Sequence, residues 1–157
     1  MHLAIYHPAI PQNTGNLGRL CVGLATELHL IGPCAFDFSE KALRRAGLDY
    51  WQHLHWTLHA DAEAFLAWLG GRRPWPVTKH GAVRYDRAAF SDDDVVLIGN
   101  ENTGLPDAWL ARWADRCVSI PMLGPLRSFN QCNAAAIVLA QATLAAGRFD
   151  RLPHHEA

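Results

Sequence analysis

The 157-residue sequence lacks the features that mark several common classes of protein. Its four cysteines include no Cys-x-x-Cys pair, so neither a zinc site nor a thioredoxin-like redox motif is indicated. The N-terminus has no basic start followed by a long apolar run, and no apolar stretch is long enough to span a bilayer. We therefore expect a reduced, cytoplasmic protein that makes no use of a membrane.

The usual nucleotide-binding signatures and a strongly basic charge are missing as well. Neither Gly-x-Gly-x-x-Gly after the first strand nor a Walker-type phosphate loop occurs, which argues against a nicotinamide-binding Rossmann site. A net charge of −1 argues against a protein that grips RNA by charge alone. One local basic cluster is present in SEKALRRAG, and it is either an RNA contact or a solvated helix face: Lys41, Arg44 and Arg45.

Apolar strand patterns alternate with helical patterns along the chain. Strands are expected at 2–6, 28–31, 53–56, 74–78, 94–98 and 118–121, and helices at 14–26, 39–47, 60–69, 106–114 and 130–146. This alternation predicts an α/β fold with a parallel sheet flanked by helices, in a single domain over 1–157 with a loose tail from residue 150. The prolines in 74–78 favour a sheet edge or the start of a strand over the interior of a central strand, and Asn13 or Thr14 is expected to cap the first helix.

Three polar, glycine-containing segments follow expected strands. They are PQNTGNLGR (11–19), IGNENTGLP (98–106) and IPMLGPLRSFNQCN (120–133). In open α/β sheets, ligands bind beyond the carboxyl ends of the strands, so the three segments together predict a composite site. Each segment alone is weak evidence for such a site.

The second and third segments hold the groups best placed to bind a ligand. Gly99 and Gly104 allow backbone conformations that are closed to other residues, and Glu101 lies between them. Such a loop either offers bare N–H and C=O groups to a flat ligand such as adenine or is a simple strand-to-helix turn. Ser128 and Asn130 precede the last helix, and they either cap it or hold a substrate or cofactor.

Arg19 and the histidines each have a functional and a structural interpretation. Arg19, on the first helix, is either solvated or a contact to a phosphate or ribose. The nine histidines raise the question of a metal site, and His53, His55 and His59 are close in sequence. Because the first two alternate with apolar residues as in a strand, we assign these histidines to a strand surface and predict no metal site.

Four stretches of sequence, taken together and in this order, resemble the SPOUT class of RNA methyltransferases. They are IPQNTGNLGRLC, LRRAGLDYW, GNENTGLP, and IPM followed by RSFNQCNAAA, and the likeness extends to about Arg148. The most similar group methylates the ribose 2′-hydroxyl of the wobble nucleotide of tRNA. The resemblance implies a parallel sheet with a C-terminal trefoil knot, a homodimer whose site is completed by both protomers, and the tRNA anticodon stem-loop as substrate.

The resemblance also implies a cofactor and a set of site residues. The cofactor is S-adenosylmethionine, with S-adenosylhomocysteine as product and no metal. Cofactor-binding positions are expected at Val77, Gly99, Glu101, Gly104, Ile120, Met122 and Ser128. The expected catalytic residues are Arg19, Ser128 and Asn130, and the expected RNA contacts are Arg19, Lys41, Arg44 and Arg45.

The chain departs from the family pattern at two of these places. The family commonly has Gly-Pro-Glu where this chain has Gly99-Asn100-Glu101, and we expect Asn100 to make that loop more mobile. The third motif usually reads Ser-Leu-Asn-x-Ser, whereas here it ends in Cys132. The thiol of Cys132 is expected to form weaker hydrogen bonds than a hydroxyl.

Methyl transfer to a ribose needs the 2′-oxygen in line with the donor methyl group and a route for the hydroxyl proton. Arginine stays protonated in proteins, so Arg19 is expected to orient the ribose and stabilise charge while an RNA phosphate or water takes the proton. Three alternatives are open: methylation of another tRNA or rRNA position, a non-catalytic RNA-binding protein on the same fold, and a flavodoxin-like nucleotide binder. The loop chemistry disfavours the last of these.

Overall fold

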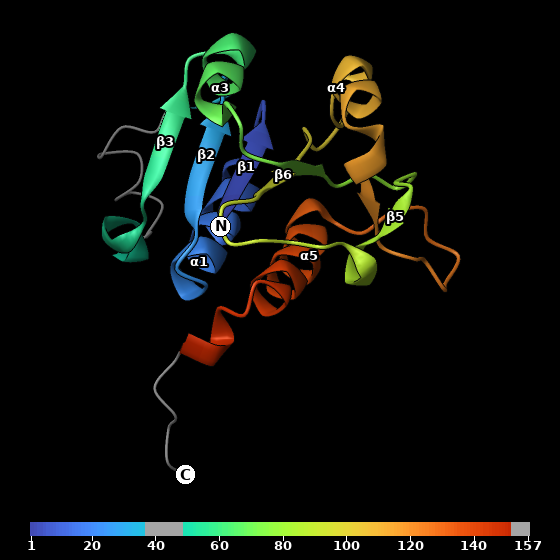
Figure 1. Cartoon of the computed structure of the whole chain (residues 1–157). Helices are drawn as coiled ribbons and strands as arrows, with labels where there is room; N and C mark the ends of the chain where they lie inside the picture. Colours follow the sequence, from blue (N-terminus) through green and yellow to red (C-terminus); the bar gives the residue numbers. More distant parts are fainter. Residues whose placement is uncertain (37–48, 152–157) are drawn as a thin grey trace.

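The computed structural model describes residues 1–36 and 49–151 of the chain. Five parallel strands form its main sheet, in the order β3-β2-β1-β6-β4 (Figure 1). They are β1 (His2–Tyr6), β2 (Glu27–Ile31), β3 (Trp56–His59), β4 (Pro74–Pro76) and β6 (Val95–Ile98). A small parallel sheet pairs β5 (Val83–Arg84) with β7 (Val118–Ser119) and meets β4 through the bridge between Val77 and Val118.

Helices cover both faces of the main sheet (Figure 1). The α-helices are α1 (Pro11–Gly23), α3 (Ala62–Leu69), α4 (Asp107–Arg112) and α5 (Gln131–Ala145). Short 3-10 helices are η1 (Asp49–His53), η2 (Tyr85–Arg87), η3 (Ala114–Arg116) and η4 (Phe149–Arg151). This arrangement confirms the predicted α/β fold with a parallel sheet flanked by helices. In the part of the chain that the structure describes, no helix is long and apolar enough to cross a membrane.

The central strands β1, β2 and β6 are buried on both faces, because their alternating side chains pack against helices on either side of the sheet. On one face, Leu3 of β1 belongs to a core that includes Val138 of α5. On the other face, Ala4 belongs to a core that includes Phe65 of α3 and Trp109 of α4. The two cores hold the strands in place, so the loops that leave the carboxyl edge start from a fixed platform.

The strand that carries two prolines lies at the edge of the main sheet, as predicted. Residues Pro74–Pro76 pair only with β6, and the order of strands ends there. Proline has no N–H to donate, so an edge strand tolerates it where a central strand does not. Trp75, between the prolines, is buried in the core.

The strand expected at 53–56 is wrong, because the strand spans Trp56–His59 instead. Residues Asp49–His53 form a 3-10 helix that packs near α1. The alternating pattern extends to residue 59, so only the pairing with β2 decides which half forms the strand. His55 is exposed outside the strand and His59 is buried within it, so assigning these histidines to a strand surface is also wrong.

Several predictions concern residues outside the described ranges. They are the helix at 39–47, with Lys41, Arg44 and Arg45, and the end of the loose tail beyond residue 151. These stay predictions, as does the trefoil knot that the resemblance implies.

Candidate functional site at the carboxyl edge of the sheet

A cavity of about 510 Å³ opens at the carboxyl edge of the sheet. Its lining comes from four places: residues 77–80 after β4, residues 98–105 at the end of β6 and beyond, Asp107 and Leu110 of α4, and residues from Ile120 to the first turn of α5. The cavity brings together all the positions at which cofactor binding is expected: Val77, Gly99, Glu101, Gly104, Ile120, Met122 and Ser128. Small-molecule sites usually enclose about 300–1,000 Å³, so the cavity has the size of a ligand site.

The loop after β6 turns back on itself through backbone hydrogen bonds. The Asn100 N–H donates to the Gly104 carbonyl at 3.1 Å, and the Gly104 N–H donates to the Asn100 carbonyl at 2.9 Å. A Cβ atom on Gly99 would lie 2.3 Å from the carbonyl carbon of Gly104, whose own φ is +74°. Both positions therefore require glycine, and the loop presents bare backbone to the cavity.

The side chain of Asn100 restrains the loop at the position where we expected added mobility. Its Nδ2 donates to the carbonyl of His7 at 2.6 Å, across to the end of β1. Its Oδ1 accepts from the N–H groups of Asn102 (2.9 Å) and Thr103 (3.1 Å). An asparagine that bonds to the backbone two residues on stabilises a turn, so Asn100 replaces the stiffness of proline with hydrogen bonds.

The carboxylate of Glu101 joins the loop after β6 to the segment before α1. It accepts hydrogen bonds from the N–H groups of Ala9 (3.0 Å) and Ile10 (3.2 Å) and from Nδ2 of Asn13 (3.3 Å). Hydrogen bonds to an ionised acceptor are among the stronger ones in proteins. Glu101 thus lines the cavity while its carboxylate holds together two of the predicted segments.

Helix α1 begins at Pro11, earlier than the predicted start at residue 14. Pro11 suits the first turn because it has no N–H to satisfy. The cap position is Ile10, which forms no side-chain cap, so Asn13 or Thr14 as N-cap is wrong. The acceptor for the preceding amides comes from Glu101, far along the chain, which a local pattern cannot show.

Gln131, the first residue of α5, belongs to the site although no motif in the sequence indicated it. Its Nε2 donates to the Gly99 carbonyl at 2.8 Å, which ties the third segment to the second. Its Oε1 is buried and has no hydrogen-bond partner among the described residues, and Gln131 lines the cavity. A buried acceptor without a donor costs free energy, so this atom is suited to accept an N–H or O–H from a ligand. The only sequence signal was its place directly after Asn130.

The third segment divides its polar groups between the cavity and the helix. Asn130 is the N-cap of α5, with Oδ1 accepting from the Cys132 N–H at 2.8 Å, and it does not line the cavity. This confirms the capping interpretation of Asn130. Ser128 is exposed and lines the cavity. The Cys132 thiol lies 3.4 Å from the Asn13 carbonyl, and burial, together with the nearby Glu101 charge, raises its pKa.

Arg19 lies on the exposed side of α1 and does not line the cavity of its own chain. Its guanidinium carbon is 4.9 Å from the centre of the Tyr50 ring, within cation–π range. The Tyr50 hydroxyl donates to the Gly15 carbonyl at 2.5 Å, which fixes the ring against the helix. The arginine is therefore oriented by α1 and η1, outside the pocket.

Charged side chains of both signs stand around the cavity. Lys79 and Arg127 are exposed, line the cavity and form no ion pair with another described residue. Asp107, at the start of α4, also lines it. Unpaired cations at the rim are available to a negatively charged substrate, and no motif in the sequence indicated Lys79.

Comparison with known proteins shows which protein family this chain is similar to. A model of the SpoU rRNA Methylase family matches residues 1–140. The chain is 40% identical to the tRNA (cytidine(34)-2′-O)-methyltransferase of Methylovorus glucosotrophus over 141 residues, which cover 89% of this chain and 92% of that protein.

Two solved structures are similar over nearly the whole chain. One, described as giving structural insights into the 2-OH methylation of C/U34 on tRNA, is 41% identical with a TM-score of 0.85 and covers 92% of this chain and 94% of its own. The other, an AdoMet-bound rRNA methyltransferase from Sinorhizobium meliloti, is 26% identical with a TM-score of 0.77 and covers 91% and 55%. This chain therefore belongs to the SpoU rRNA methylase family.

Proposed function

We propose that this chain transfers a methyl group from S-adenosylmethionine to the ribose 2′-hydroxyl of tRNA nucleotide 34, the wobble position. The proposal is carried by one observation: every residue expected to bind the cofactor lies in a single cavity at the carboxyl edge of the sheet. The substrate follows from the relatives, whose descriptions specify 2′-O-methylation at position 34 of tRNA. A single domain over the whole chain is part of the proposal.

The cavity suits S-adenosylmethionine chemically. Gly104 has no side chain and open space where one would stand, so a flat adenine ring can approach its backbone, and the unpartnered Oε1 of Gln131 accepts a hydrogen bond. Val77 and Ile120 supply apolar contacts. Bound there, S-adenosylmethionine supplies the methyl group and leaves as S-adenosylhomocysteine, and the AdoMet-bound relative supports this assignment.

In this proposal Arg19 orients the ribose and stabilises negative charge on the 2′-oxygen as its proton passes to an RNA phosphate or to water. Because Arg19 does not line the cavity of its own chain, the proposal includes a homodimer in which Arg19 of one protomer reaches the partner's cavity. Large exposed apolar side chains near the cavity suit such an interface: Leu123, Leu126 and Phe129. The basic cluster of Lys41, Arg44 and Arg45 then binds the anticodon stem-loop.

The decisive experiment is methyl transfer to bulk tRNA, mapped by nucleotide. We expect one 2′-O-methyl group at position 34 and saturable binding of S-adenosylmethionine by calorimetry. Methylation elsewhere in tRNA, or of rRNA only, would reassign the substrate. Cofactor binding without transfer to any RNA would favour a non-catalytic protein, and no cofactor binding would overturn the proposal.

The role of Arg19 has its own test. Arg19→Lys keeps the charge but loses the planar fork, so turnover should fall while cofactor binding is unchanged, and near-normal turnover would refute the need for a guanidinium. For the dimer, Arg19→Ala chains are co-expressed with Gly99→Ala chains. Random pairing makes about half of the dimers mixed. If the site is shared between protomers, one of the two sites in each mixed dimer is intact, so roughly a quarter of wild-type activity is restored. A site within one chain restores nothing.

A further inference from the structure

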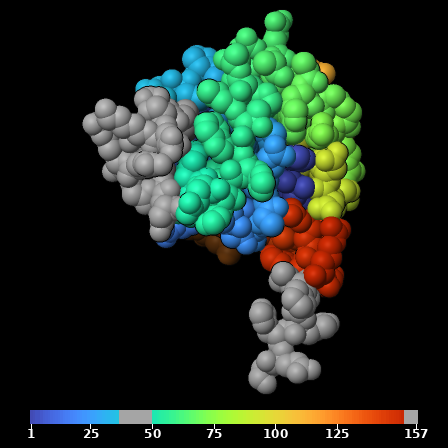
Figure 2. All heavy atoms as spheres, turned by 90° about the vertical axis from the view of Figure 1, so that its left-hand side faces the viewer, coloured from blue at the N-terminus to red at the C-terminus, as the bar shows by residue number. Residues whose placement is uncertain are grey.

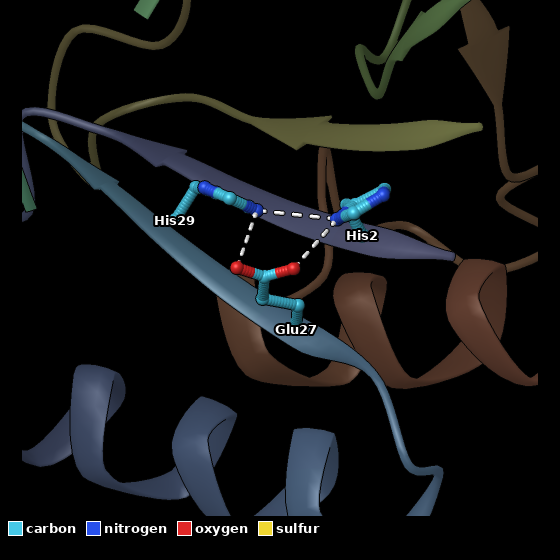
Figure 3. A group of neighbouring side chains, drawn as sticks. All are labelled: His2, Glu27 and His29. Atoms are coloured by element: carbon cyan, nitrogen blue, oxygen red, sulfur yellow. Dashed lines mark hydrogen bonds and ion pairs between the residues drawn. The ribbon is translucent and has the colours of Figure 1, made fainter. Parts of the chain in front are cut away.

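A group of metal-ligating side chains lies at the opposite, amino edge of the main sheet. His2 and Glu27 are the first residues of β1 and β2 and are paired in register, and His29 follows on β2. The three side chains converge in the space beside these strands (Figure 3). His2 Nδ1 is 3.2 Å from His29 Nε2, and oxygens of Glu27 lie 3.5 Å from the former and 3.7 Å from the latter.

We propose that His2, Glu27 and His29 bind one divalent transition-metal ion, best matched by Zn²⁺. Zinc binds imidazole nitrogen and carboxylate oxygen at about 2.0–2.2 Å in a tetrahedron, which places its ligand atoms about 3.3 Å from one another. The 3.2 Å separation of the two ring nitrogens is close to this edge length, and each nitrogen lies near a different oxygen of the Glu27 carboxylate, at 3.5 Å and 3.7 Å. An ion therefore fits among the side chains with small adjustments, and a water molecule completes the fourth position.

Both histidines have partners that hold their rings in the orientation a metal ligand needs. The other nitrogen of His2, Nε2, is 3.1 Å from the Asp93 carboxylate. The other nitrogen of His29, Nδ1, is 3.0 Å from Nε2 of His59. Histidine ligands of metal ions nearly always donate their second N–H to a carboxylate or another acceptor, which fixes the tautomer. Each ring thus has a partner for its second nitrogen: Asp93 for His2, and His59, the last residue of β3, for His29.

The cluster has more acceptor lone pairs than N–H donors to satisfy them, which also favours a bound cation. With neutral rings, the His2 N–H at Nε2 goes to Asp93, so Nδ1 of His2 presents a lone pair. That lone pair and the Glu27 carboxylate both face His29 Nε2, which has one proton at most to offer. A cation among the three atoms satisfies all of them once His29 carries its proton on Nδ1 and donates it to His59.

The cluster is partly buried yet open to solvent on one side. His29 is fully buried, and the Trp68 ring lies over it with ring centres 3.8 Å apart. The side chain of Glu27 is 39% exposed and that of His2 is 12% exposed. Figure 2 shows the N-terminal end of the chain, in dark blue, reaching the surface between green and yellow segments. An ion can thus enter past Glu27 and rest on a buried imidazole.

The ligand set selects among metals and indicates the role of the ion. Imidazole nitrogen favours Zn²⁺, Cu²⁺ and Ni²⁺, whereas Mg²⁺ and Ca²⁺ prefer an all-oxygen set. Two of the ligands start β1 and β2 and the third lies two residues further along β2, while the cavity follows the strand ends, so the ion joins β1 to β2 without touching the candidate active site. We therefore assign it a structural role that is independent of the proposed function.

The test is calorimetric titration of Zn²⁺ into chelator-treated full-length protein that has its native N-terminus and no histidine tag. We expect one ion per chain and a melting temperature that rises with Zn²⁺ concentration, since the ion binds the folded state. His2→Gln and Glu27→Gln each remove a partly exposed ligand and should weaken binding by more than roughly 100-fold, and Asp93→Asn by roughly 10-fold. Bound Co²⁺ should show the strong visible bands of a tetrahedral site.

Two matched controls separate this site from other histidines. His53→Gln alters an exposed histidine, and a His154→Gln, His155→Gln double variant alters a pair outside the described residues. Both should bind Zn²⁺ as the wild type does. Absence of saturable binding, loss of binding only in the tail variant, or unchanged binding in His2→Gln would each overturn the proposal. None of these outcomes bears on methyl transfer, so the two proposals fail separately.

Discussion

The two ends of the same sheet are built in different ways. At the carboxyl edge, the cavity depends on loops that hold one another through contacts between distant segments, such as Glu101 with Ile10 and Gln131 with Gly99. At the amino edge, His2, Glu27 and His29 stand on regular strands, and register alone brings them together. The comparison teaches that the first site is specified by backbone shape and the second by side-chain identity.

The largest effect is expected from Gly99→Ala, which attacks backbone shape directly. Its Cβ would meet the carbonyl carbon of Gly104 at 2.3 Å, and backbone cannot move aside as a side chain can. We expect a destabilisation of about 3 kcal/mol and loss of calorimetric binding of S-adenosylmethionine. Gly124→Ala is the control, because its Cβ would meet no atom within 4 Å. If Gly99→Ala still binds S-adenosylmethionine, the site at the carboxyl edge does not depend on backbone shape.

Glu101→Gln tests whether one carboxylate holds the carboxyl edge together. The amide keeps one acceptor but loses the charge that strengthens the bonds from the Ala9 and Ile10 amides. We expect the free energy of unfolding in urea to fall by about 2 kcal/mol. Glu63→Gln on the exposed first turn of α3 makes the same chemical change and should cost below about 1 kcal/mol. Equal losses in the two variants would show that Glu101 has no special role.

Lowering the pH should destabilise the folded protein through the histidines at and next to the amino edge of the sheet. Burial lowers the pKa of His29 from 6.5 to about 3 and lowers the pKa values of His2 and His59 as well. At a pH between about 3 and 6.5, these histidines bind protons in the unfolded chain but not in the folded chain. The free energy of unfolding therefore decreases as the pH falls below about 6.5.

For His29 alone, the loss between pH 7 and pH 5 amounts to about 2 kcal/mol. Urea unfolding at the two pH values, with a chelator present, measures it. The loss should be smaller in His29→Gln and unchanged in His53→Gln, whose side chain is exposed. A wild-type stability that does not change over this range would contradict the burial of neutral histidines.

The smallest effect is expected from Cys132→Ser, which restores the hydroxyl usual in the family. The thiol contacts Asn13 at 3.4 Å and 3.6 Å, and a hydroxyl fits the same space. We expect stability and cofactor affinity to change by less than about 0.5 kcal/mol. A larger gain in stability or cofactor affinity would mean that the contact between Cys132 of α5 and Asn13 of α1 contributes more to the site at the carboxyl edge than the shape of its backbone does.

Particular residues show how far the sequence could lead. Gly99, Glu101 and Ser128 were found because short motifs in the right order point to strand-end loops. Gln131 was missed, since its bond to Gly99 exists only after α5 packs beside the loop after β6. The metal-ligating group was missed for a related reason: His2 is far from His29 in sequence, and the histidines that are neighbours, His53 and His55, lie apart from it.

The sequence by itself determined the alternation of strands and helices, the proline-bearing edge strand and two of the segments that line the cavity, because these depend on periodicity and local backbone chemistry; the third predicted segment, 11–19, does not line it. Only the tertiary structure decided where α1 begins, which half of the pattern around His55 forms a strand, and which side chains meet at each end of the sheet. Those outcomes depend on pairing between distant residues, and a linear pattern carries no record of which distant group supplies a hydrogen bond.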